Sequence, residues 1–335
     1  ELNIYDSQYS RIDQTTYAEL LERLYEAQVS AFPALNIDRI GFSKMLKKIY
    51  LTNSIMYANN ELKVKYRKTE FQLHLTFTHK DNRIEIIDNK PFFSMLNPDK
   101  LVARAYNLLN SLTASQQVNL SVKHLILSPE AAATILREFS DHFRLNSEKR
   151  IKNITFPQAL SIIDNPRLDR QSSSVPFDDE GIQAVETVLI EKGFLKNTIS
   201  NIETALSSGM QSTGNGFRSQ KTIFPEIKFT NLYIKPSVFP FSKLMSDGDR
   251  GILISLVKVK RIEGAVYTFS AYGYQFSNGT INEPVHIYLK TTFENFFLSV
   301  LKVSKEIRFF YNQSNVGAPY LLIEPGKKSG NLFEL

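Results

Sequence analysis

Hydrophobic positions in the first hundred residues change between helical and strand spacing. An amphipathic helix is predicted over residues 16–32, because apolar residues recur every three or four positions. These are Tyr17, Leu20, Leu21, Leu24 and Tyr25. Thr16 and Glu19 have the spacing of a capping box, so the helix is expected to begin at Thr16 and to end at Pro33.

β-rich and alternating patterns follow this helix. They predict strands over residues 50–54, 62–67, 71–78 and 83–87. Asn59-Asn60 and Asp81-Asn82 are the expected turns between them. A second amphipathic helix is predicted over residues 97–112, with Asn97 as the N-cap and Pro98 at the first helical position.

The second half of the chain has mainly strand patterns. A short buried strand at residues 124–127 is expected to enter directly a helix that begins at Ser128 and ends near Phe143. Hairpin turns are predicted at Lys192-Gly193 and Asn278-Gly279. The other expected elements are a loop at 165–176, strands at 229–234, 251–259, 266–274, 285–289 and 320–323, and a helix at 291–304.

This order of elements predicts an α+β fold. A helix-and-sheet domain over residues 1–115 is expected to precede a larger β-rich domain over residues 116–335. A chain of 335 residues also favours two domains over one. No run of 18 apolar residues is present, so no membrane contact is expected.

Cysteine content and charge narrow the function further. The chain has no cysteine, which excludes disulfides, cysteine proteases and cysteine-ligated zinc and fits a cytoplasmic location. The net charge of +6 permits contact with acidic partners. No helix-turn-helix, zinc-finger or RNA-binding signature accompanies that charge, so nucleic acid is not the expected partner.

Three adjacent acids form the first candidate site. Asp178, Asp179 and Glu180 precede Gly181, just after the predicted loop. Clustered carboxylates can hold a hard cation or supply acid–base chemistry. They can equally accept backbone amides in a turn, with Gly181 providing a permissive conformation. Neighbouring side chains point in different directions, which favours the structural interpretation.

A loop rich in glycine and hydroxyl groups is the second candidate. It runs from Ser208 to Arg218 and includes Ser212, Thr213, Gly214 and Asn215. Exposed amides of such a loop can hold a phosphate, but the loop lacks the ending of a P-loop. An amide-rich loop that binds an extended peptide is the better interpretation.

The third candidate is the helix that begins at Ser128. Locally it is a well-capped helix start, with Pro129 in the first turn and Glu130 at the positive end of the dipole. The five histidines are isolated, and no pair has the spacing of a metal site. No metal ligand or cofactor is therefore predicted from the residues themselves.

The order of these segments resembles the TldD/PmbA family, often described as modulators of DNA gyrase, and within it the PmbA (TldE) branch. The resemblance extends from about Asn97 to the end of the chain. It rests on five segments in sequence: Leu125 to Ala132, Phe177 to Gly181, Ser212 to Asn215 with Arg218, Thr230-Asn231-Leu232, and Gly317 to Ile323.

The resemblance implies an α+β fold and a pairing of TldD with TldE as a protease for extended or unfolded peptides. In the TldD branch a His-Glu-x-x-x-His helix and a distant cysteine bind the metal, and the glutamate is the general base. Pro129 and Thr134 stand here where the two histidines would be, and Glu130 matches the glutamate. The cysteine is absent as well, so all three metal ligands are missing. The family also implies further residues before Glu1.

The leading hypothesis is a non-catalytic subunit that binds extended peptides and pairs with a TldD-like catalytic paralogue or with a second copy. Its peptide groove or interface is expected at Asp178, Asp179, Glu180, Gly181, Ser212, Thr213, Gly214, Asn215, Arg218 and Asn231. The first alternative is an active hydrolase that uses the acidic cluster with a metal. The second is a regulator associated with DNA gyrase or nucleic acid.

Overall fold

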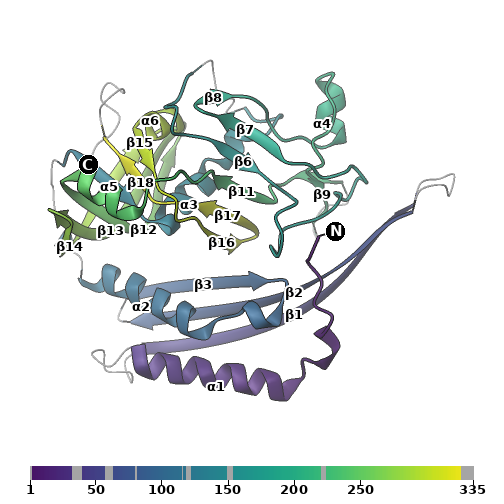
Figure 1. The fold of residues 1–335 in the computed structure, drawn as a ribbon, viewed down its shortest axis with the longest axis horizontal. Helices are drawn as coiled ribbons and strands as arrows, with labels where there is room; N and C mark the ends of the chain where they lie inside the picture. The colour runs from purple at the N-terminus through teal and green to yellow at the C-terminus, as the bar shows by residue number, and fades with distance from the viewer. Residues whose placement is uncertain are drawn as a thin grey trace.

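The structure is a computed structural model, and it describes residues 2–31, 40–56, 63–79, 81–114, 116–117, 122–148, 154–219 and 224–325. A helix-and-sheet region from the N-terminal part of the chain lies against a larger β-rich region (Figure 1). The α+β class and the order of the two regions, predicted from the sequence, are confirmed.

The N-terminal region is a three-stranded antiparallel sheet covered by two helices. β1 (Ile40–Met56), β2 (Lys63–His79) and β3 (Asn82–Lys90) pair in chain order. α1 (Gln14–Ala31) and α2 (Pro98–Ala114) pack on one face of this sheet, which Figure 1 shows from the side. The described residues of this region also form two short 3-10 turns, η1 (Tyr9–Arg11) and η3 (Phe93–Met95). Alternate residues of β2 face the helices, so its residues 71, 73, 75 and 77 are buried.

Two local predictions in this region are wrong. α1 begins two residues before Thr16, and the backbone amide of Thr16 donates to Asp13 Oδ1 at 3.0 Å. Asp13, a residue that often caps helices, thus replaces the predicted capping box. The strands predicted at 62–67 and 71–78 are one strand, β2, because it pairs continuously with β1 from Lys63 to His79. Pro33 and the turn at Asn59-Asn60 lie outside the described residues.

A seven-stranded sheet forms the base of the larger region, in the order β15-β18-β5-β12-β13-β14-β4. In chain order its strands are β4 (Gln116–Gln117), β5 (His124–Leu127), β12 (Arg250–Glu263), β13 (Val266–Ser277), β14 (Thr280–Thr291), β15 (Val300–Val303) and β18 (Leu321–Ile323). β5 is buried between β12, to which it is parallel, and β18, to which it is antiparallel.

A six-stranded sheet in the order β16-β17-β11-β6-β7-β8 forms the other layer. Its strands are β6 (Ile162–Asp164), β7 (Thr187–Glu191), β8 (Phe194–Leu195), β11 (Asn231–Ile234), β16 (Arg308–Asn312) and β17 (Ser314–Ala318). A separate two-stranded ribbon joins β9 (Gly216–Phe217) to β10 (Glu226–Ile227).

The helix predicted at Ser128 lies between these two sheets. α3 (Pro129–Glu138) contacts β12 on one side and β16 and β17 on the other. Ala131, Ala132 and Ala133 are fully buried, and their small side chains allow this close approach. The predicted end near Phe143 is a 3-10 turn, η4 (Ser140–Phe143), which follows α3.

The described residues form three further helices: α4 (Ile202–Ser207), α5 (Phe241–Gly248) and α6 (Phe293–Leu298). α5 packs against β5 and β18 of the seven-stranded sheet. The predicted helix over 291–304 is therefore wrong in its second half. Val300 to Val303 forms β15 instead, because it pairs with β18. A short apolar run fits helix and strand spacing alike, and here pairing with β18 makes it a strand.

The two predicted hairpin turns are confirmed. Lys192 and Gly193 join β7 to β8 with positive φ of 46° and 87°, and Asn278 and Gly279 join β13 to β14 with φ of 50° and 76°. Positive φ at both central residues is the geometry that such dipeptides favour. Within the described residues, no helix has the length and apolar character needed to cross a membrane.

Candidate functional site

Pro129, Glu130 and Thr134 serve the architecture of α3. Ser128 Oγ accepts from the Ala131 amide at 3.2 Å, so Ser128 is the N-cap that the sequence predicts. Pro129 is buried in the first turn. The hydroxyl of Thr134 donates to the backbone oxygen of Glu130 at 2.8 Å, one helical turn earlier. Pro129 thus packs in the core, and Thr134 bonds back to the helix backbone.

The Glu130 carboxylate is held by an arginine from the N-terminal region. Arg104 of α2 donates from Nε to Glu130 Oε2 at 2.9 Å and from Nη2 to Oε1 at 2.6 Å. The Arg104 guanidinium also lies 4.8 Å from the centre of the Phe310 ring. Both side chains of the pair are largely buried, at 24% and 16% exposed. A forked pair of this kind is strong and directional.

These residues do not fit a zinc ion. Catalytic zinc sites use histidine, cysteine and carboxylate ligands and keep one coordination position open. On α3 the carboxylate is occupied by Arg104, the flanking positions are Pro129 and Thr134, and the middle of the helix is enclosed by core. In the part of the chain that the structure describes, no group of three or more such ligands is placed to hold a metal.

The carboxylates of Asp178, Asp179 and Glu180 do not converge on one point, and each accepts hydrogen bonds from a different part of the backbone. Asp178 is buried, and its carboxylate accepts from the amides of Glu180, Ile182 and Gly216 at 2.9–3.0 Å. Burial raises the pKa of Asp178. Gly181 has a φ of +84°, which suits glycine at this turn.

Asp179 and Glu180 connect the same turn to two other segments. Asp179 Oδ2 accepts from the amide of Arg218 at 2.8 Å. Glu180 Oε2 accepts from the amide of Ile202, the first residue of α4, at 2.8 Å. Burial raises the pKa of Glu180. The acidic cluster therefore holds a turn against its neighbours, as the structural interpretation of the sequence expects.

The loop rich in glycine and hydroxyl groups is folded against the segment at Ser200. Ser212 Oγ donates to the backbone oxygen of Ser200 at 3.4 Å. Thr213 Oγ1 accepts from the Ser200 amide at 2.8 Å and donates to Asn215 Oδ1 at 2.8 Å. Gly214, at φ +74°, lies against the backbone of Gln183, where an added Cβ would be 2.9 Å from the carbonyl oxygen. These contacts hold the loop in one shape.

Asp164, at the end of β6, is the buried acid beneath this loop. It is fully buried, and its carboxylate accepts from Asn215 Nδ2 at 2.8 Å and from the Thr230 amide at 2.9 Å. Burial outweighs these hydrogen bonds and raises the pKa of Asp164 to about 6. Sequence reasoning missed Asp164, because a single aspartate after two isoleucines carries no local signal.

Asn231 begins β11 and is fully buried. Its Nδ2 donates to the backbone oxygen of Asn165 at 2.7 Å and to Ser174 Oγ at 3.0 Å. Its Oδ1 accepts from Asn315 Nδ2 at 3.1 Å. Asn231 therefore ties β11 to the 165–176 loop and to β17.

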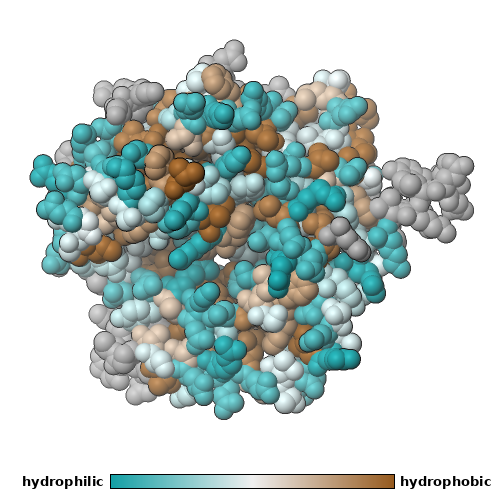
Figure 2. Space-filling view, viewed as in Figure 1, coloured by the Kyte–Doolittle hydropathy of each residue, from teal (hydrophilic) through white to brown (hydrophobic). Residues whose placement is uncertain are grey.

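The candidate residues thus come together as one polar framework behind a large cleft. The cleft has a volume of about 1280 Å³ and lies between β1 and β2 of the N-terminal region and loops of the larger region. Of the candidate residues, only Asp179 and Arg218 line it. The molecular surface is hollowed along the boundary of the two regions, where hydrophilic side chains gather (Figure 2).

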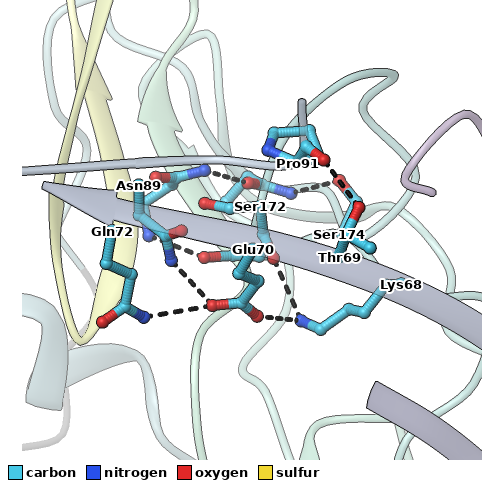
Figure 3. A network of polar contacts seen from close by, with 11 residues as sticks. Lys68, Thr69, Glu70, Gln72, Asn89, Pro91, Ser172 and Ser174 are labelled. Atoms are coloured by element: carbon cyan, nitrogen blue, oxygen red, sulfur yellow. Dashed lines mark hydrogen bonds and ion pairs between the residues drawn. The ribbon is translucent and has the colours of Figure 1, made fainter. Parts of the chain in front are cut away.

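A buried ion pair on β2 forms part of the cleft wall. Lys68 Nζ lies 2.7 Å from Glu70 Oε1 and donates to the backbone oxygen of Ser172 at 3.0 Å (Figure 3). Asn89 Nδ2 donates to Glu70 Oε2 at 2.8 Å. Burial lowers the pKa of Lys68 and raises that of Glu70, but their mutual attraction reverses both shifts. The pair connects β2 to the 165–176 loop across the boundary.

Comparison with known proteins identifies the class. A family model described as the PmbA/TldA metallopeptidase C-terminal domain matches residues 122–327. This segment contains α3, the polar framework and all strands of the two large sheets except β4. The chain belongs to the PmbA/TldD metallopeptidase family.

Curated relatives share part of this segment. A metalloprotease of Methanothermobacter thermautotrophicus is 31% identical over 131 residues, which cover 38% of this chain and 28% of that protein. A zinc metalloprotease TldD homologue of Saccharolobus solfataricus is 29% identical over 48% of this chain and 39% of its own length. A metalloprotease PmbA homologue of Buchnera aphidicola is 25% identical over 54% of this chain and 38% of its own length. These matches therefore span less than half of each relative.

Solved structures share the fold over nearly the whole chain. A Thermotoga maritima protein described as a candidate modulator of a DNA gyrase superposes with a TM-score of 0.79 at 23% identity, covering 97% of this chain and 76% of its own. TldE from Thermococcus kodakarensis superposes with a TM-score of 0.73 at 17% identity, covering 91% of this chain and 72% of its own. At this identity the likeness establishes the fold.

Proposed function

We propose that the chain is a non-catalytic, PmbA/TldE-type subunit of a TldD/TldE-type protease and binds extended or unfolded peptides. One observation carries the proposal. Where the resemblance to the TldD branch would place metal ligands and a general base, α3 has Pro129 and Thr134, and its Glu130 carboxylate is bound by Arg104. A glutamate needs a metal-bound water to act as the base of such a protease, and Pro129 and Thr134 do not offer the imidazole ligands that would hold that metal.

The cleft is the proposed peptide groove. Its walls combine apolar side chains such as Val175 and Phe217 with charged ones, a mixture that suits a peptide of varied sequence. Asp179 and Arg218 are the candidate residues with access to a bound peptide. The others shape the groove from behind: Asp178, Glu180, Gly181, Ser212, Thr213, Gly214, Asn215 and Asn231.

The proposal includes a division into domains and a partner. Residues 1–115 and 116–335 form two domains, joined by the Arg104–Glu130 and Lys68–Ser172 contacts. The proposed partner is a TldD-like catalytic paralogue or a second copy of this chain, and the proposed location is the cytoplasm, which the absence of cysteine fits. Coexpression with a paralogue that keeps His-Glu-x-x-x-His tests the pairing by copurification.

Binding of a natively unfolded polypeptide tests the proposal. Fluorescently labelled β-casein, followed by anisotropy, should bind saturably to the wild-type chain and remain intact on a gel. Asp179→Asn with Arg218→Gln should weaken binding, whereas the exposed Arg261→Gln should not. Absence of saturable binding would contradict the peptide-binding role. Cleavage of casein that Asp179→Ala abolishes would support the acidic-cluster hydrolase instead.

A further inference from the structure

Three polar atoms on the walls of the cleft have no hydrogen-bond partner among the described residues: Ser172 Oγ, Arg137 Nε and Arg144 Nε. The Arg144 guanidinium already has a carboxylate partner, because its Nη1 lies 3.2 Å from Asp141 Oδ1. Ser172 is 2% exposed, yet its hydroxyl is unpaired, although its backbone oxygen accepts from Lys68. Arg137 Nε is buried and also unpaired. Both residues line the cleft. An unpaired buried polar group is costly, and a bound ligand that supplies the missing partner removes that cost.

The positive charge of the Arg137 side chain is only partly balanced by its neighbours. It stands in the last turn of α3, and its Nη2 donates to the backbone oxygen of Phe310 at a long 3.3 Å. Burial lowers the pKa of the Arg137 guanidinium, and the nearby Arg104 lowers it further against the attraction of Glu138 and Glu130. Glu130 is already engaged with Arg104. An additional negative charge in the cleft would therefore stabilise Arg137.

Arg137 and Ser172 belong to one continuous wall of the cleft. Arg137 contacts Phe310 of β16, and the next residue, Tyr311, lines the cleft beside the Lys68–Glu70 pair. Lys68 in turn holds the backbone of Ser172. A single ligand lying along this wall can thus pass from Arg137 to Ser172.

The charge of the whole cleft limits the kind of anion. Its lining has five basic side chains, Lys68, Arg137, Arg144, Arg218 and Lys228, and five acidic ones, Glu70, Glu138, Asp179, Glu203 and Glu226. A polyanion such as nucleic acid would meet five carboxylates along this lining. A single carboxylate needs only one local cation, and a guanidinium binds it through matched hydrogen bonds.

We infer that the cleft binds peptides that carry a carboxylate, with Arg137 receiving the carboxylate and the Ser172 hydroxyl donating to the bound peptide. The inference rests on the proposed peptide-binding function and adds a substrate preference to it. The carboxylate has two sources, the peptide C-terminus or an aspartate or glutamate side chain.

Matched alanine-based octapeptides with an N-terminal fluorophore test this preference by anisotropy. One ends in a free carboxylate and one in an amide, and a second pair of amides carries Glu or Gln in the middle. Wild-type protein should bind at least one carboxylate peptide about tenfold or more tightly than its neutral match. The first pair reports a C-terminal site and the second a side-chain site.

Variants assign the preference to the two residues. Arg137→Gln should abolish the difference between matched peptides, and Arg137→Lys should keep part of it, while Arg261→Gln should leave it unchanged. Ser172→Ala should weaken binding of all peptides several-fold without lowering the melting temperature, because the hydroxyl has no partner in the free protein.

The outcomes separate the inference from the proposed function. Equal binding of charged and neutral peptides would overturn the carboxylate preference and leave peptide binding intact. A preference that survives Arg137→Gln would overturn the assignment to Arg137. If neither the octapeptides nor β-casein bind, both the inference and the proposed function fail.

Discussion

Glu130 on α3 accepts both hydrogen bonds that the Arg104 guanidinium on α2 can direct at one carboxylate, at 2.9 Å and 2.6 Å. The pair joins the N-terminal region to the helix at the centre of the larger one. It also occupies the glutamate that the resemblance to TldD would make a catalytic base. The proposed non-catalytic role rests on this ion pair.

Loss of this ion pair should destabilise the fold. Glu130→Gln leaves a largely buried guanidinium without its counter-charge, and Arg104→Gln leaves the carboxylate alone. Each substitution should lower the free energy of unfolding by about 2–4 kcal/mol, measured by urea denaturation. A double-mutant cycle should give a coupling of about 1–3 kcal/mol. Coupling near zero would show that the pair contributes little beyond packing.

Restoring the two missing histidines should not restore catalysis. The double variant Pro129→His, Thr134→His places imidazoles on α3, but the chain supplies no cysteine and Glu130 stays bound to Arg104. The variant should neither copurify with zinc nor hydrolyse casein, and it should lose stability because position 129 is buried. Stoichiometric zinc by elemental analysis together with new cleavage would show that α3 still forms a competent metal site.

Asp164 should make the protein more stable at mildly acidic pH. Its carboxyl has a pKa of about 6 when folded and an ordinary value of 3.8. The folded state therefore binds a proton at a higher pH than the unfolded state does. This contribution to stability falls as the pH rises from about 4 to about 6, by up to roughly 3 kcal/mol.

Comparison with Asp164→Asn isolates this contribution. The substitution removes the titrating group, so the stability of the variant relative to wild type should rise as the pH increases through that range. Urea denaturation at pH 4, 5, 6 and 7 provides the measurement. Parallel pH profiles for the two proteins would show that Asp164 is not the group that titrates.

Substitution of Asp178 should lower the stability of the fold and leave its metal content unchanged. Asp178→Ala removes the acceptor of three backbone amides, two within its turn and one from Gly216. The free energy of unfolding should fall by about 2–4 kcal/mol, while Asp81→Asn, at an exposed position, should change it little. Loss of a bound metal in the Asp178 variant, with stability unchanged, would favour the hydrolase alternative.

Local signals in the sequence were the most reliable. Ser128 and Asn97 cap helices, and Lys192-Gly193 and Asn278-Gly279 turn hairpins, because each depends on a few adjacent residues. The helix predicted over 291–304 was half wrong, since residues of its second half pair with β18, 18 to 23 positions further along the chain.

In the candidate site, too, features of adjacent residues were predicted and contacts between distant residues were not. The acidic turn and the glycine-rich loop were found, because their composition is unusual. Their partners were not, since Asp164 lies 51 residues from Asn215 and Arg104 lies 26 residues from Glu130. Such pairs exist only after the sheets have formed. The unpaired groups of Ser172 and Arg137 likewise have no sequence signal.

Peptide hydrolysis by the purified chain tests the central claim most directly. β-casein incubated with the protein alone, with added zinc and with EDTA should stay intact in all three conditions. Glu130→Gln should behave identically, because Glu130 serves an ion pair and not a metal-bound water. Cleavage that requires zinc, stops with EDTA and disappears in Glu130→Gln would contradict the non-catalytic account.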